Sequence, residues 1–222
     1  MSSNPFMEFL RPHRSVPKTP WTSNGRWDLT PLRVFILIGA LFTFGIGDAF
    51  VIQSNIGNAP WSVLAQGISR NLDITMGWST FAISAAVLLA WIPLREKPGF
   101  GTIANLVIIA VAIQIGVSII PVQNNFLLGI VFALLGIGMV GVATSFYITC
   151  GLGSGPRDGL MTALHNRSGV RVGRVRLGIE LTVVVFGAIL GGKVGLGTVL
   201  FALLIGQSIA IALGVVARLT TR

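Results

Sequence analysis

The segment richest in reactive and backbone-shaping residues is GLGSGPRDGLM, residues 151–161, which directly follows a long apolar stretch. Pro156 suits the first turn of a helix, because the N–H that proline lacks would have stayed unpaired there. A helix N-terminus exposes N–H groups and the positive end of the helix dipole, so it favours an anion. Three groups would add donors: Ser154, the backbone at Gly155, and Arg157. We therefore predict substrate contact here, with Asp158 positioning Arg157 or serving as a proton site.

A structural role is the alternative, in which Arg157 and Asp158 neutralise each other and fix a tight, dry reversal of the chain. The first half of the sequence contains a counterpart, NIGNAPWSVLA, residues 55–65. Both segments share a Gly-x-x-Pro helix break, formed by Gly57 and Pro60 and by Gly153 and Pro156. Three residues of the first break are candidates for the same substrate site: Asn58, Trp61 and Ser62.

Two carboxylates, Asp48 and Glu180, lie inside apolar stretches. Ionisable groups within a membrane are costly, so both are functional candidates. The alternative for Glu180 is an ion pair with Arg176, one helical turn earlier. Other polar residues in apolar stretches are predicted to form hydrogen bonds between helices: Asn105, Gln114 and Gln207.

The spacing of the remaining reactive residues argues against an enzyme. Gly151 and Gly153 begin a G-x-G-x-x-G pattern, but Pro156 ends it, and no G-x-x-x-x-G-K-[ST] occurs. The same proline follows Ser154 by two positions, so a nucleophile elbow is missing. Two histidines and one cysteine do not form a convincing metal cluster. We expect no enzymatic activity, no cofactor and no metal site.

The composition indicates a membrane protein. Of 222 residues, 53% are hydrophobic and 10% are charged, whereas soluble domains carry roughly 25% charged residues. Apolar stretches of about 20 residues can cross a bilayer as helices. We predict an all-α polytopic protein with six transmembrane helices over residues 32–53, 77–94, 100–120, 127–149, 174–191 and 197–217. The segments 60–71 and 156–168 are too short to cross, and are predicted as short helices, interfacial or re-entrant.

The sequence contains two related units. A shift of 96 positions aligns Gly57 with Gly153, Pro60 with Pro156 and Lys97 with Lys193 without a gap. Matching glycines and prolines indicates matching bends, since both residues act on the backbone. We divide the membrane part into repeats 31–121 and 122–222. Three spans per repeat is an odd number, so the second repeat is predicted to be inverted. Such repeats recur in transporters, with the site near the repeat interface.

Positive charge predicts the orientation. The net charge is +9, and the basic residues gather in a predicted tail (residues 1–30), in the turn at 95–97, in the segment 157–176 and at the C-terminus. With six spans, the positive-inside rule places these clusters and both termini in the cytoplasm, where they would meet anionic lipid. Because the charges sit at span ends, we expect no nucleic-acid binding.

The motif from Gly153 to Leu160, paired with Ala59 to Gly67, resembles the YczE/YyaS group of bacterial integral membrane proteins. The resemblance covers about residues 30–217 and implies a small multi-pass inner-membrane protein rather than a particular activity. Members of the group often read Pro-Trp-Asp in the first unit, where this chain has Pro60-Trp61-Ser62. The departure removes one of two equivalent acids and weakens any mechanism that needs both.

Two functions remain open from the sequence. The first is a transporter or channel for a small or amphiphilic solute, anions included, with lipid translocation as a variant. The second is a membrane scaffold or accessory subunit that stabilises or regulates a partner enzyme complex, or assembles with copies of itself. A polar cavity that reaches both helix breaks would favour the first function, and a dry repeat interface the second.

Overall fold

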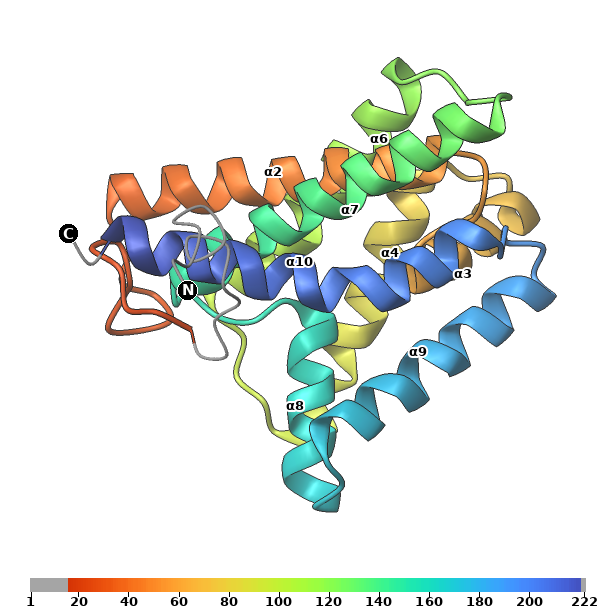
Figure 1. The fold of residues 1–222 in the computed structure, drawn as a ribbon. Helices are drawn as coiled ribbons and strands as arrows, with labels where there is room; N and C mark the ends of the chain where they lie inside the picture. Colours follow the sequence, from red (N-terminus) through yellow and green to blue (C-terminus); the bar gives the residue numbers. More distant parts are fainter. Residues whose placement is uncertain (1–15, 221–222) are drawn as a thin grey trace, which may run out of the picture.

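The computed structural model describes residues 16–220, which form helices joined by short connections (Figure 1). The helices are α2 (Pro31–Gln53), α3 (Pro60–Leu72), α4 (Met76–Leu89), α5 (Trp91–Leu94), α6 (Phe100–Ile119), α7 (Phe126–Thr149), α8 (Pro156–Ser168), α9 (Val172–Ile189) and α10 (Leu196–Thr220).

Five stretches are long and apolar enough to cross a membrane: α2, α4 with α5, α6, α7 and α10. Each coincides with a predicted span to within three residues. A helix also forms at the sixth predicted span, α9, but this helix contains Arg174, Arg176 and Glu180 and is not among the five. The chain is thus an all-α polytopic membrane protein.

Both predicted helix breaks are present. Gly57 and Gly153 have φ angles of +127° and +114°, a region that favours glycine. Pro60 and Pro156 are the first residues of the short helices α3 and α8. Each short helix has 13 residues and is therefore about 20 Å long at 1.5 Å per residue, less than the roughly 30 Å of a bilayer core.

The helices interlock across the two halves of the chain. α2 packs against α6 and α7, and α7 packs against α10. The short helices cross over, so that α3 packs along α9 and α8 packs against α4 (Figure 1). Glycines permit the close approach of α2 to its neighbours: a Cβ on Gly47 would lie 2.9 Å from that of Met139 on α7. Each helix break is therefore held beside helices of the other half.

One hydrogen bond recurs at positions 96 residues apart. The N–H of Gly101 donates to the carbonyl of Leu152 at 2.8 Å, and the N–H of Gly197 donates to the carbonyl of Ile56 at 3.0 Å. Each bond joins the break of one half to the start of the last long helix of the other half. The two halves thus share this tertiary contact as well as a sequence pattern.

Residues 16–30 differ from the predicted solvated tail. The indole N–H of Trp21 donates to the hydroxyl of Thr149 at 3.1 Å, and the ring stacks on Phe146 with centroids 6.1 Å apart. The N–H of Ser23 donates to the carbonyl of Cys150 at 3.0 Å. The segment packs over the end of α7 because Trp21 supplies an apolar anchor. The prediction of a solvated tail rested on the basic residues and did not consider this side chain. Residues 1–15 of the predicted tail lie outside the described residues.

Candidate substrate-binding cavity

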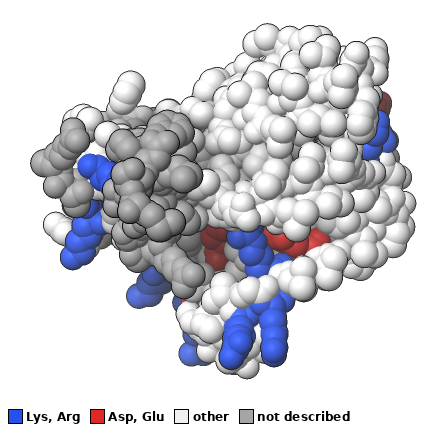
Figure 2. All heavy atoms as spheres, in the orientation of Figure 1, with Lys and Arg blue, Asp and Glu red and all other residues white. Residues whose placement is uncertain are grey.

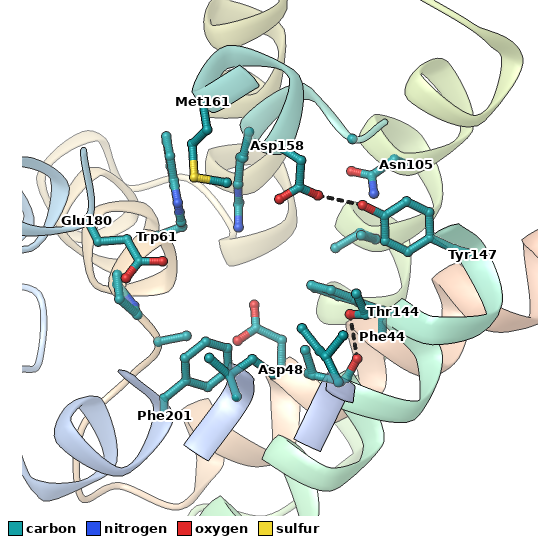
Figure 3. Close-up of a pocket in the computed structure, with 18 of the residues that line it drawn as sticks. Phe44, Asp48, Trp61, Asn105, Thr144, Tyr147, Asp158, Met161, Glu180 and Phe201 are labelled. Atoms are coloured by element: carbon teal, nitrogen blue, oxygen red, sulfur yellow. Dashed lines mark hydrogen bonds between the residues drawn. The ribbon is translucent and has the colours of Figure 1, made fainter. Parts of the chain in front are cut away.

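A cavity of about 120 Å³ lies at the centre of the helices and receives side chains from both halves of the chain (Figure 3). This volume is well above the ~10–15 Å³ that one water needs. Its wall includes Phe44 and Asp48 on α2, Trp61 on α3, Tyr147 on α7 and Phe201 on α10. The cavity is thus aromatic around a few polar groups, as small-molecule sites usually are.

Asp48 faces the open centre of this cavity (Figure 3). Its side chain is almost fully buried, with 3% of the residue exposed. Oδ2 accepts a hydrogen bond of 2.7 Å from the hydroxyl of Ser62 on α3. Oδ1 is buried and has no hydrogen-bond partner among the described residues. A buried oxygen left in this state is costly unless a ligand or water completes it.

Asp158 approaches the cavity from α8 (Figure 3). Its Oδ2 accepts a hydrogen bond of 2.5 Å from the hydroxyl of Tyr147, which is 2% exposed. The acid is therefore held by α7 and not by the neighbouring Arg157, with which it forms no ion pair within 4.0 Å. The direct ion pair of Arg157 with Asp158 that the structural alternative would use is therefore not formed, although the two charges still interact electrostatically.

The guanidinium of Arg157 lies over the ring of Trp61, with 4.9 Å between Cζ and the ring centroid. This is a cation–π contact, which Arg forms with Trp more readily than with other rings. Within the described residues the guanidinium has no hydrogen bond or ion pair, and it lines the cavity. Its donors are therefore available to a solute.

Arg176 and Glu180 line the cavity from α9. Nε of Arg176 lies 2.8 Å from Oε1 of Glu180, so the predicted i, i+4 pair is confirmed. α9 does not pack along α10, whereas the corresponding helices of the first half, α4 and α6, pack together. Figure 2 shows acidic and basic side chains exposed in a recess between α10 and the part of the molecule formed by α8 and α9.

Lining residues recur at the 96-residue spacing. Seven pairs of equivalent positions both line the cavity: Phe44 and Val140, Asp48 and Thr144, Ala59 and Gly155, Trp61 and Arg157, Ser84 and Glu180, Asn105 and Phe201, Ile109 and Ile205. The cavity is therefore built from matching positions of the two halves, although the residue types differ in six of the seven pairs.

Of the predicted substrate residues, four line the cavity: Trp61, Gly155, Arg157 and Asp158. Ser62 does not line the cavity but donates a hydrogen bond to Asp48, which does. Asn58 does not reach the cavity, because its amide donates to Gln66 Oε1 at 2.9 Å and its N–H donates to the carbonyl of Lys193. Ser154 is exposed outside the cavity, and its carbonyl accepts from the hydroxyl of Thr102 at 2.7 Å. Both therefore stabilise the chain reversals.

Several lining residues were not predicted as site residues from the sequence, and Tyr147 and Thr144 are the most important of them. Tyr147 is the one tyrosine of the chain, and a phenol within an apolar span was a signal that went unused. Thr144 is the counterpart of Asp48 in the alignment of the two units. Asn105 was predicted to form a hydrogen bond between helices, but it lines the cavity. Gln114 does form such a bond, because its Oε1 accepts from the N–H of Gly77 at 3.0 Å.

Position 62 has serine where the group often has aspartate, but α2 provides an acid nearby, Asp48. In the second half the short helix holds the acid, Asp158, and the spanning helix holds a hydroxyl, Thr144. In the first half the order is reversed, because Asp48 is on the spanning helix and Ser62 is on the short helix. Two aspartates, one from each half, thus reach the cavity despite the departure from Pro-Trp-Asp.

Residues 31–213 match a family model described as a family of unknown function, DUF6198. An uncharacterized protein of Haemophilus influenzae is 41% identical over 206 residues, covering 93% of this chain and 94% of the relative. The uncharacterized membrane protein YczE of Bacillus subtilis is 31% identical over 79% of this chain and 82% of its own length. The uncharacterized protein YyaS of the same bacterium is 25% identical over 82% and 92%. No solved structure matches. The chain belongs to this family, and the resemblance to the YczE/YyaS group is confirmed.

Proposed function

We propose that this protein is a small inner-membrane transporter or channel whose central cavity binds the solute. The observation that carries the proposal is the set of seven lining pairs 96 positions apart. In transporters built from inverted repeats, the substrate site lies at the repeat interface and is lined by broken helices. A scaffold needs no polar cavity at that place, so the cavity favours a role in handling a solute.

The proposal includes two inverted repeats of three spans, 31–121 and 122–222. The paired hydrogen bonds of Gly101 and Gly197 support equivalence of the halves. α9 would be the sixth span. Its charges make this costly, but Arg176 and Glu180 pair with each other, and Arg174 lies in the first turn, from which a long side chain can reach the membrane interface.

Charge supports cytoplasmic termini. At one end of the molecule, Arg26 donates to the carbonyl of Lys97, and Arg167 donates to the carbonyl of Pro93 at 2.9 Å. These contacts bring together the N-terminal segment, α5 with the connection that follows it, and the end of α8. Arg70 lies apart from these basic residues, because its guanidinium donates to the carbonyl of Gly191 at 2.5 Å. The larger basic group would face the cytoplasm and its anionic lipids.

Arg157 is the proposed contact for an acidic group of the solute, because its guanidinium has unused donors in the cavity and such donors bind carboxylate or phosphate well. The solute would be small or amphiphilic. Asp158, held by Tyr147, would position the polar end of the solute or exchange a proton with it.

A thermal-shift screen of purified protein in detergent tests the proposal, with anions, metabolites and lipids as ligands. A ligand at a hundred times its Kd stabilises the native state by about 2.7 kcal/mol. We expect stabilisation by at least one solute, its loss in Arg157→Ala, and its retention in Arg70→Ala, an arginine at the other end. Counterflow into proteoliposomes then checks transport.

If no ligand stabilises the wild-type protein and Arg157→Ala is merely less stable, a scaffold role replaces the proposal. Stabilisation by long-chain lipids alone, with dye-labelled lipid crossing the bilayer of proteoliposomes, would indicate lipid translocation.

A further inference from the structure

The cavity contains one carboxylate oxygen and one guanidinium that form no hydrogen bond or ion pair with the described residues. Oδ1 of Asp48 is buried and unbonded, although Oδ2 is held by Ser62. The guanidinium of Arg157 is stacked on Trp61 but forms no hydrogen bond or ion pair within the described residues. The two charges line the same cavity and yet stay beyond the 4.0 Å of an ion pair. Opposite charges in a buried site are costly when they are unpaired.

The other charged groups of the cavity already have protein partners. Asp158 accepts from Tyr147, and Glu180 is paired with Arg176. The lining carries three acids (Asp48, Asp158, Glu180) and two arginines (Arg157, Arg176), which gives a formal charge of −1. A simple anion would bind Arg157 but add to this negative charge, and it would leave Asp48 unpartnered. A simple cation would leave Arg157 unpartnered.

We propose, building on the transport function above, that the solute is a small zwitterion whose ammonium group binds Asp48 and whose carboxylate or other acid group binds Arg157. Asp48 faces the centre of the cavity, and the aromatic residues Phe44 and Phe201 lie beside it (Figure 3). These walls suit a short carbon chain between two charged ends. The cavity of about 120 Å³ limits the solute to a small molecule.

Three probes of equal chain length separate the contributions of the two charges: β-alanine has both charges, propionate only the negative and propylamine only the positive. Thermal-shift titrations of the full chain in detergent give an apparent Kd for each. We expect β-alanine, or a longer ω-amino acid with its matched acid and amine, to bind at least about tenfold more tightly than either partner, since a hydrogen bond to a charged group has about this value.

Asp48→Asn keeps the shape of the side chain and should abolish the preference for the zwitterion over propionate. Asp73→Asn is the matched control, because Asp73 is an exposed acid at the end of α3 where Asn tolerates the same backbone conformation. If Asp48→Asn does not give a monodisperse protein, the comparison of the three probes on the wild type still decides the question.

Equal affinity for propionate and the zwitterion, or binding of neither, would overturn the zwitterion proposal. Transport is judged separately. Counterflow of propionate without a preference for the amino acid would keep the transporter and reject the zwitterion. Tight β-alanine binding without counterflow would keep the zwitterion site and reject transport.

Discussion

Exchanging the carboxylate and the hydroxyl between positions 48 and 62 tests whether this buried pair acts as a unit. The perturbation is Asp48→Ser combined with Ser62→Asp, beside each single variant. The two residues are 3% and 2% exposed and are joined by a 2.7 Å hydrogen bond. The second half already has the exchanged order, with Thr144 on the spanning helix and Asp158 on the short one. The double variant therefore places the residue types in the order of the second half, although there Thr144 donates to the carbonyl of Val140 and Asp158 accepts from Tyr147.

The size of the effect follows from burial. A hydrogen bond to a charged group contributes about 1.5–3 kcal/mol, and a buried polar group without its partner costs a similar amount. Asp48→Ser should therefore lower the free energy of unfolding by about 2 kcal/mol. Ser62→Asp should cost at least as much, because it sets two buried carboxyl groups against each other. The double variant restores the pair, so it should be more stable than either single variant.

Unfolding in mixed micelles titrated with SDS, followed by tryptophan fluorescence, gives the four free energies of this cycle. We expect a coupling of about 2 kcal/mol or more in favour of the double variant, well above the ~0.3–0.5 kcal/mol scatter of independent sites. Asp73→Asn shows what the loss of an exposed acid does on its own. If the double variant loses as much free energy of unfolding as the two single variants lose together, positions 48 and 62 do not form an interchangeable pair.

Three further predictions concern the framework of the cavity. Gly136→Ala should lower the apparent Tm, because its methyl group would overlap α2 and overpacking costs about 1–3 kcal/mol, whereas Gly138→Ala has no atom within 4 Å of its added Cβ and should leave the Tm unchanged or raise it. Cys150 is fully buried, and burial raises the pKa of its thiol to about 11, so maleimide labelling should be slow at pH 7 in the native protein and fast in SDS; fast native labelling at pH 7 would contradict this. Trp21→Phe keeps a ring at the end of α7 but loses the hydrogen bond to Thr149, so it should destabilise the protein by about 1 kcal/mol, and an unchanged denaturation midpoint would show that the N-terminal segment does not help to hold α7.

The helices and the helix breaks were predictable because local chemistry determines them. Long apolar runs with few charges give the spans, and Gly57 and Gly153 mark places where a positive φ is required. Prolines then begin the short helices. The alignment of these backbone-acting residues revealed the 96-residue spacing, which reappears in the lining of the cavity.

The cavity itself was only partly predictable, because it depends on which helices meet. That Ser62 would bind Asp48, 14 positions earlier, follows from the packing of the short helix and not from local sequence. The same holds for Tyr147 and Asp158. Asn58 resembled a site residue by its position in the break, but the fold uses its amide to fix the reversal.

The contact of Arg157 with Trp61 shows where the two halves of the chain meet. These residues occupy equivalent positions, and equivalent residues can touch only where the two halves meet. The proposed solute site therefore lies where the two halves of the chain meet, yet its two sides differ in charge, with Asp48 opposite Thr144 in the alignment and Trp61 opposite Arg157. A site with two identical sides would hold a solute in two equivalent orientations. A site with two unlike sides, as proposed here, would bind the two ends of a solute differently. α4 and α6 of the first half pack together, whereas α9 and α10 of the second half do not pack along each other, so the two halves differ in packing as well as in charge.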